Sequence, residues 1–419
     1  MKIIDTLKIG NYEKSVFENG LVVISEQVQN TASYSAGICV NIGARDDSIS
    51  GIAHFMEHAV FRHTKKRNSK QIANEFETLG AYSNAFTTKE QTCFYVRAIK
   101  NHFAKTFELL CDIVLNAIFI EDEIEREKLI ILEEIKSYED DPEEYIFDLA
   151  DIATFSNHNL ANPITGWQDT VKQIDYKELE NFYKTFYRAE NIVVCVVGDV
   201  NHKNVVKLVN KYFSEKELNC TLPIKLRTKP TINYVNKTIK KTIQQAHIVL
   251  GKQTQGLQST EYYPLAVLNT LFGDGMSSRL YQNLREKHGL AYSIYSSINS
   301  YTDCGSWYIY AATDAKKYKR TIDLIYKEMQ KLMLKMPTKK ELNRAKEQLK
   351  TATIIEQESL SSRMQNLLKN EIVFGKYEQT VDIIQKIDQV TLDDIHTLSN
   401  KYFCENNWAI ASIIPDNFF

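Results

Sequence analysis

The chain has 419 residues, too many for one compact core, and this length predicts two or more domains. Hydrophobic residues (43%) and charged residues (25%) occur at the frequencies of an ordinary globular protein. A formal net charge of −2 provides no basic field, which argues against a nucleic-acid partner, and no apolar run reaches the length needed for membrane insertion. Seven cysteines without a CxxC pair predict reduced thiols and a cytoplasmic protein.

The first half of the chain alternates between strand and helix patterns. Residues 15–24 predict two strands joined at Asn19-Gly20, a dipeptide typical of tight hairpins. Residues 81–96 predict another pair of strands about a polar turn near Lys89. The other strands are expected at 34–42 and 191–197, and the helices at 69–79, 101–116, 121–139, from 143 onward and at 175–186.

The segment Gly51-Ile-Ala-His-Phe-Met-Glu-His-Ala-Val-Phe61 contains a pattern with a specific chemical use. His54 and His58 are four residues apart, so on a helix their imidazoles lie on one face. This spacing suits two nitrogen ligands of one metal ion, most commonly zinc. Glu57 stands beside His58, within reach of a water molecule on such a metal. The alternative is a helix with two surface histidines, but the chain has only 9 histidines, which makes a chance match rare.

A catalytic zinc ion takes three protein ligands and leaves a fourth position for water, so a third ligand is expected. Residues 125–136 predict a helix on which Glu127 and Glu134, two turns apart, share a face, whereas Glu133 points elsewhere. The apolar block 129–132 predicts that this helix is buried, and a buried carboxylate needs a partner such as a metal ion. The alternative is a solvated run of glutamates.

With these residues the chain resembles the pitrilysin-type (inverzincin) zinc metallopeptidases, including the β subunit of the mitochondrial processing peptidase and its bacterial homologues. The resemblance rests on His54-Phe-Met-Glu57-His58 and on the later Glu-Lys-Leu-Ile-Ile-Leu-Glu-Glu-Ile, which starts at Glu127. It implies a Zn²⁺ ion bound by His54, His58 and Glu134. It also implies that Glu57 is the general base and that Glu127 supports the site without binding the metal.

The second half of the chain repeats the pattern of the first. Residues 174–200 align without gaps on residues 390–416, and both contain a helix, an aromatic pair, an asparagine and an apolar strand. We therefore expect an α+β fold of two similar domains from an internal duplication, each with the mostly antiparallel sheet and packed helices that the resemblance implies. The expected boundaries are a catalytic zinc-binding domain at 1–216, a linker at 217–229 and an inactive substrate-binding domain at 230–419.

In the second half, the counterpart of the zinc-motif helix at 260–272 contains no histidine, so this half is expected to bind substrate instead of a metal. The following run, 273–292, has two glycines but no Gly-Lys-Ser/Thr, which argues against a phosphate-binding loop. It resembles the family's Gly-Met-Ser-Ser-Arg-Leu segment and its continuation, which implies that Arg285 and Tyr292 reach the substrate. Without the resemblance, a surface arginine and a core tyrosine would be the simpler interpretation.

The expected function is a zinc-dependent hydrolysis of peptide bonds in unfolded oligopeptides or presequence-like peptides. The peptide substrate would lie extended along an edge strand, which the resemblance places at 83–87, with Asn84, Ala85 and Phe86. The chain is shorter than the family members that carry both halves of an enclosed chamber, so we expect a homodimer, or a heterodimer with a metal-free paralogue, in the bacterial cytoplasm. The alternative is a non-catalytic scaffold or partner subunit.

Overall fold

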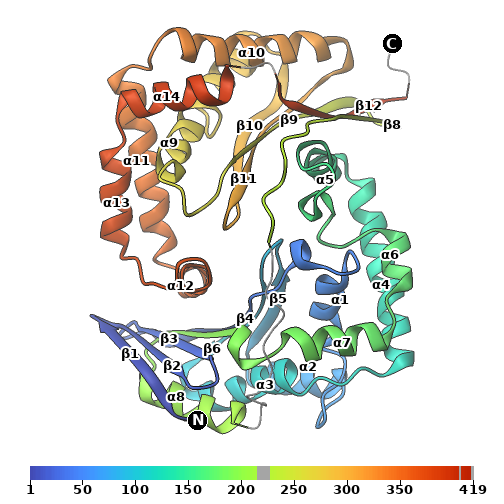
Figure 1. Cartoon of the computed structure of the whole chain (residues 1–419), viewed down its shortest axis with the longest axis vertical. Coiled ribbons are helices and arrows are strands. Elements are labelled where there is room, and N and C mark those ends of the chain that lie inside the picture. The colour runs from blue at the N-terminus through green and yellow to red at the C-terminus, as the bar shows by residue number, and fades with distance from the viewer. Residues whose placement is uncertain (215–226, 405–406, 417–419) are drawn as a thin grey trace. The chain divides into compact units, whose positions relative to one another are not determined.

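The computed structural model describes residues 1–214, 227–404 and 407–416, which form two compact units (Figure 1). Residues 217–226 of the predicted linker lie outside the described residues. Among the helices of the described part, none is long and apolar enough to cross a membrane. The units are made of interleaved segments: unit 1 of Met1–Ile135, Pro163–Arg227 and Glu356–Tyr377, and unit 2 of Lys136–Asn162, Thr228–Ile355 and Glu378–Phe419.

Unit 1 is built on a seven-stranded sheet with the order β1-β2-β3-β7-β4-β6-β5. Neighbouring strands are antiparallel except β3 and β7, which are parallel. The predicted hairpin at Asn19-Gly20 joins β2 to β3, and Gly20 has φ 81°, a backbone conformation that favours glycine. The N-terminal edge strand β1 is absent from the predicted elements. The strands are β1 (Ile3–Ile9), β2 (Tyr12–Phe17), β3 (Val22–Gln27), β4 (Ser33–Val40), β5 (Tyr82–Thr87), β6 (Thr92–Ile99) and β7 (Ile192–Gly198).

Helices cover both faces of this sheet (Figure 1). The main core lies on one face, beneath helices that include α1, α3 and α8. The other face, which carries Cys39, Cys93 and Cys195, is covered by α12, and a Cβ at Gly37 would come within 2.8 Å of Met364 of that helix. The helices of unit 1 are α1 (Ile52–Ala59), α2 (Ser69–Thr78), α3 (Phe103–Leu115), α4 (Glu121–Asp140, which continues into unit 2), α6 (Gln168–Gln173), α7 (Tyr176–Phe186), α8 (His202–Phe213) and α12 (Leu360–Phe374).

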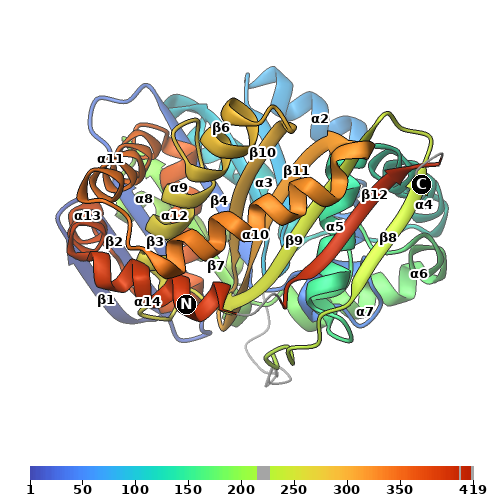
Figure 2. The same cartoon turned by 90° about the horizontal axis from the view of Figure 1, so that it is seen from above.

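Unit 2 is built on a five-stranded sheet with the order β10-β11-β9-β12-β8 (Figure 2). Helix α5 packs on one face of this sheet, and α9, α10 and α14 form the core on the other face. The strands are β8 (Asn236–Lys241), β9 (Gln245–Gln255), β10 (Ala291–Ser300), β11 (Cys304–Asp314) and β12 (Ala409–Pro415). The helices are α5 (Pro142–Thr154), α9 (Tyr262–Phe272), α10 (Tyr318–Leu334), α11 (Lys339–Glu356), α13 (Thr380–Gln389) and α14 (Leu392–Phe403).

The two sheets share one topology, which confirms the predicted fold of two similar α+β domains. Strand β12 lies between antiparallel β9 and parallel β8, as β7 lies between antiparallel β4 and parallel β3. The gapless alignment of 174–200 with 390–416 places α7 and β7 on α14 and β12. This match of topology and of element positions indicates a duplicated unit, to which the first half adds β1 and β2.

The compact units differ in two segments from the expected boundaries of 1–216 and 230–419. Helix α5 comes from the first half of the chain but belongs to unit 2. Helix α12 comes from the second half but belongs to unit 1. Each half therefore gives one helix to the sheet of the other half. An apolar helix face shows only that a helix is covered, not which sheet covers it, so the sequence pattern does not reveal this exchange.

Candidate functional site

Helix α1 starts at a tight backbone turn in unit 1. Gly51 precedes the helix with φ 96°, and a Cβ at this position would lie 2.7 Å from the carbonyl oxygen of Thr165. Both constraints require glycine here. The buried Asp47 carboxylate accepts hydrogen bonds from the backbone N–H groups of Gly51 (2.8 Å) and Ala53 (3.2 Å). These bonds satisfy donors that the helix itself leaves unpaired and thereby fix where α1 begins.

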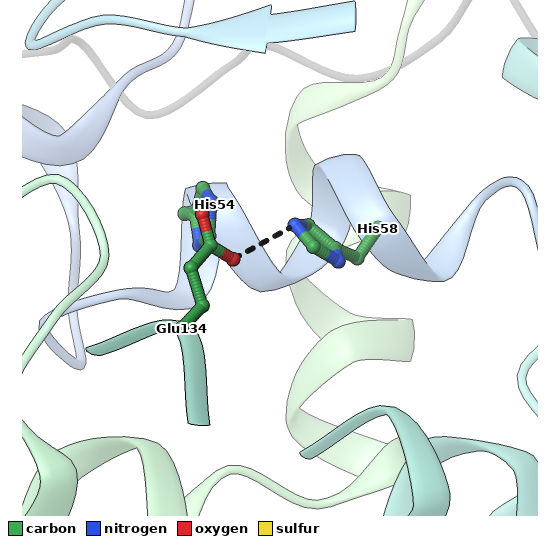
Figure 3. Close-up of side chains that lie close together, drawn as sticks. All are labelled: His54, His58 and Glu134. Atoms are coloured by element: carbon green, nitrogen blue, oxygen red, sulfur yellow. Dashed lines mark ion pairs between the residues drawn. The ribbon is translucent and has the colours of Figure 1, made fainter. Parts of the chain in front are cut away.

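Two histidines of α1 and one glutamate of α4 lie close together (Figure 3). His54 Nε2 is 3.8 Å from Glu134 Oε1, and His58 Nε2 is 3.5 Å from Glu134 Oε2. One ligand atom from each residue lies within 4.8 Å of the other two, and this is the one such group of histidine, cysteine or carboxylate side chains in the described part of the chain. Two imidazole nitrogens and one carboxylate oxygen are a donor set that suits zinc and leaves a fourth position open.

The electrostatic environment keeps His54 neutral. Burial, followed by the neighbouring His58, lowers the pKa of His54 to about 3. A neutral imidazole keeps a lone pair available for a metal ion, whereas an imidazolium has none. The Nδ1 atom of His54 is buried without a hydrogen-bond partner among the described residues. The other ring nitrogen, Nε2, is the one that faces Glu134.

Glu127 contacts one of these three residues, His58, on the ring nitrogen that does not face Glu134. Its side chain is buried, and its Oε1 atom accepts a hydrogen bond of 2.8 Å from His58 Nδ1. This contact leaves His58 Nε2 facing Glu134. The other carboxylate oxygen of Glu127 forms an ion pair with Arg62. The contact with His58 is the arrangement typical of a carboxylate that orients a metal-binding histidine.

The burial of α4 differs from the expectation drawn from the apolar block 129–132. Ile131 is fully buried, but Leu129 and Ile130 have exposed fractions of 63% and 50%. The prediction that this block buries the helix was therefore wrong for two of its four residues. Four consecutive residues point in all directions around a helix, so only the residues spaced with Ile131, such as Ile124 and Ile135, enter the core. Glu133 is exposed.

Glu57 projects from α1 toward the end of strand β5. The Thr87 hydroxyl donates a hydrogen bond of 2.5 Å to Glu57 Oε2. Burial is the main influence on this carboxyl and raises its pKa, while the Thr87 hydrogen bond opposes the shift. A carboxylate that is largely shielded from water, and whose pKa is raised, is a stronger proton acceptor than an exposed one.

The residues expected to bind substrate lie on two different elements. Asn84, Ala85 and Phe86 are on β5, the last strand of the unit 1 sheet. The Asn84 side chain donates to the Tyr82 hydroxyl (2.9 Å) and accepts from the Ala85 N–H (2.8 Å). Because Thr87 ends the same strand, β5 connects this sheet edge directly to Glu57.

Arg285 and Tyr292 lie together on unit 2. Arg285 belongs to the π-helix Tyr281–Lys287, and its guanidinium carbon is 4.9 Å from the ring centre of Tyr281 and 5.4 Å from that of Tyr292. Tyr292 is 75% exposed, so it is not the core tyrosine of the simpler interpretation. The arginine therefore contacts two tyrosine rings, which restrict where its guanidinium can point.

Sequence reasoning missed three residues that support the site: Asp47 holds the start of α1, and Arg62 and Thr87 contact Glu127 and Glu57. Asp47 had a usable signal, since an aspartate shortly before a predicted helix is a common N-terminal cap. Arg62 and Thr87 had none. Their partners are 65 and 30 positions away in the chain, and no local pattern encodes such contacts.

Solved structures share this fold. The crystal structure of a protease from Helicobacter pylori superposes with a TM-score of 0.87 at 23% identity, covering 96% of this chain and 99% of that chain. A crystal structure from Pseudomonas fluorescens, described as a peptidase M16 inactive domain, gives a TM-score of 0.89 at 19% identity, with 97% and 98% covered. At these identities the comparison establishes the fold alone.

Sequence comparisons identify the family. Residues 22–167 match the model of the insulinase family (peptidase family M16), and residues 173–349 match that of the peptidase M16 inactive domain. An uncharacterized zinc protease of Bacillus subtilis is 34% identical over 95% of this chain and 97% of its own length. Another from Rickettsia felis is 33% identical over 97% and 98%. This full-length similarity shows that the chain belongs to the pitrilysin-type M16 peptidase family.

Proposed function

We propose that this protein is a zinc-dependent metalloendopeptidase that hydrolyses peptide bonds in unfolded oligopeptides or presequence-like peptides. The observation that carries the proposal is the convergence of His54, His58 and Glu134, with Glu57 on the same helix as both histidines. The names of the relatives, which call them zinc proteases, support this assignment.

The three converging residues fit a zinc ion. Both histidines direct Nε2 toward Glu134, and the low pKa of His54 keeps that imidazole neutral without a metal. A zinc ion held by these residues would lower the pKa of a water molecule to about 7 and would polarise the carbonyl of the scissile bond.

Glu57 has the proposed role of proton carrier. Its carboxylate accepts a proton from the attacking water and delivers it to the amine that leaves, a role that contributes roughly 10²- to 10⁴-fold in rate. The Thr87 hydroxyl holds one oxygen of Glu57, so the carboxylate keeps a fixed direction during this transfer. Glu127 acts through His58, which it orients, and does not meet the substrate.

The free edge of β5 is the proposed platform for the substrate. An extended peptide that pairs with Asn84, Ala85 and Phe86 would gain main-chain hydrogen bonds and little side-chain selectivity. Thr87 supports this proposal because it joins the same strand to Glu57. On unit 2, Arg285 and Tyr292 are proposed to contact the substrate, the tyrosine by stabilising the charge that develops on the carbonyl oxygen.

The proposed division of labour assigns metal binding to residues 1–216 and substrate binding to residues 230–419. The match of residues 173–349 to a family model described as an inactive domain supports a second half without its own metal site. We further propose that the protein acts as a dimer, with a second copy or a metal-free paralogue, in the bacterial cytoplasm.

A non-catalytic scaffold is the second candidate, and the word "inactive" in the descriptions of both a matching model and a structural relative favours it. The motif argues against it. A scaffold has no chemical need for His54, His58, Glu134 and Glu57 in one place.

One experiment separates the two candidates. Purified protein is analysed for zinc and assayed with an internally quenched peptide, with and without chelator. We expect about one zinc per chain and cleavage that stops on chelation and returns with zinc. His58→Ala and Glu134→Ala should lose both, whereas the control Glu133→Ala, at the exposed neighbour of Glu134, should lose neither. Zinc-free protein, or zinc-loaded protein without cleavage, would contradict the proposal.

A further inference from the structure

Arg62 lies three positions beyond the end of α1, the helix that carries His54 and His58. After Ala59 the chain turns, and Thr64 forms an isolated β-bridge with Ala117, which lies between α3 and α4. Arg62 forms an ion pair with Glu127 of α4. Glu127 is nearly inaccessible to solvent, with 2% exposed, whereas the Arg62 side chain is 34% exposed. The arginine thus lies between a buried carboxylate and the surface.

The two oxygens of Glu127 have separate partners. Oε1 accepts the hydrogen bond from His58 Nδ1, and Oε2, which forms no hydrogen bond among the described residues, makes an ion pair with the guanidinium of Arg62. A carboxylate is planar, so fixing one oxygen on a guanidinium also fixes the direction of the other. His58 is held through this pair of contacts. His54, by contrast, has no hydrogen-bond partner for its buried Nδ1 among the described residues.

We propose that Arg62 is a positioning residue of the metal site: it fixes the Glu127 carboxylate so that His58 carries its proton on Nδ1 and presents Nε2 to the metal. This inference rests on the proposed function in that the metal is taken to be zinc. Among the described residues, Arg62 forms its ion pair with Glu127 and not with the three proposed ligands, and the charge of Glu123 also acts on its guanidinium. Substitution of a carboxylate that is hydrogen-bonded to a metal-binding histidine commonly changes metal affinity. Here the same effect extends to Arg62, because Arg62 holds the carboxylate of Glu127.

The pair of His63 and Glu123 provides a matched control. His63 follows Arg62 directly, Glu123 lies one turn before Glu127 on α4, and His63 Nδ1 is 3.4 Å from Glu123 Oε2. This pair joins the same two segments as Arg62 and Glu127, and among the described residues neither of its members contacts His58. His63→Gln leaves Glu123, whose charge acts on Arg62, in place. A general loosening of α1 against α4 would follow from the loss of either pair. A specific effect on His58 follows only from the loss of Arg62.

The test compares the unsubstituted protein with Arg62→Met, in which an unbranched apolar side chain replaces the guanidinium, and with His63→Gln. The dissociation constant for Zn²⁺ is measured by competition with a chromophoric chelator. We expect a rise of about 10- to 100-fold in Arg62→Met and a change below about twofold in His63→Gln. In metal-free protein labelled with ¹⁵N-histidine, the His58 ring should be the Nδ1–H tautomer in the parent and a mixture of tautomers in Arg62→Met.

Three outcomes would overturn the inference. One is a zinc affinity and a His58 tautomer that do not change in Arg62→Met. Another is an equal loss of affinity in His63→Gln, which would indicate general loosening. If circular dichroism shows that Arg62→Met does not fold, the neutral variant Arg62→Gln is measured instead. The third outcome is a zinc affinity that does not change in Arg62→Gln. Neither readout needs a substrate. A parent protein that binds no zinc would refute the proposed function, whereas a parent that binds zinc no more tightly than Arg62→Met refutes this inference alone.

Discussion

The hydrogen bond from Thr87 to Glu57 gives a quantitative prediction about catalysis. Thr87→Val removes the hydroxyl that lies 2.5 Å from Glu57 Oε2 and keeps the branched shape of the side chain. A hydrogen bond to a charged group contributes about 1.5–3 kcal/mol. If most of this energy holds Glu57 in place for proton transfer, kcat/KM should fall about 10- to 100-fold, since 1.36 kcal/mol corresponds to a factor of ten.

The same substitution should change the pH profile. The Thr87 hydrogen bond lowers the pKa of Glu57 against the larger, opposite effect of burial. Without the hydroxyl, the pKa of Glu57 rises further, and the carboxylate is protonated at a higher pH. The acidic limb of the kcat/KM profile should therefore move toward higher pH in Thr87→Val.

A double-mutant cycle with Glu57→Gln tests whether Thr87 acts through Glu57. Glu57→Gln alone should retain zinc and lower kcat/KM about 10²- to 10⁴-fold, because an amide cannot accept the proton. Adding Thr87→Val to Glu57→Gln should cause little further loss. The assay is cleavage of a quenched peptide, with zinc content measured for each variant. Full activity in Thr87→Val, or an undiminished effect of Thr87→Val in the Glu57→Gln background, would refute this reasoning.

Further predictions concern unit 2 and the stability of the protein. Arg285→Ala and Tyr292→Phe should each lower kcat/KM without changing zinc content, and loss of zinc in either variant would contradict their proposed role. Gly251→Ala should lower the free energy of unfolding by about 1–3 kcal/mol, measured by urea denaturation, because the new Cβ would lie 2.2 Å from Thr154 Oγ1 of helix α5. Burial lowers the pKa of His202 below its usual 6.5, so the unfolded chain binds a proton that the folded chain does not; stability should fall as pH drops below 6.5, and less steeply in His202→Gln.

Local spacing made part of the fold predictable from the sequence. Two features depend on residues that are close together in the sequence: the Asn19-Gly20 hairpin and the helix with His54 and His58. The repeat was recognised because 174–200 and 390–416 each contain the same short pattern of helix and strand. Such patterns constrain the backbone directly. They also identified the segment of α4 that brings Glu134 to the two histidines, although the wrongly expected burial of the block 129–132 was part of that argument.

Other features depend on contacts that the sequence does not encode locally. The edge strand β1 consists almost entirely of exposed residues, so it lacks the apolar alternation of a half-buried strand. The contacts of Thr87 with Glu57 and of Arg62 with Glu127 join different elements. The residues expected at the substrate edge, such as Asn84, came from the family resemblance and not from any spacing.

The exchange of α5 and α12 has a consequence for synthesis of the chain on the ribosome. The last strand of the first sheet, β7, ends at Gly198, but the helix that covers the face with Cys39 and Cys195 starts at Leu360. The ribosome adds the roughly 160 residues in between at about 5–20 residues per second, which takes about 8–30 s. During that time all seven strands of the sheet have been synthesised, but α12 does not yet cover their apolar face. The nascent chain therefore passes through an intermediate that is prone to aggregation. A chaperone that covers this face until α12 has been synthesised should raise the yield of folded protein.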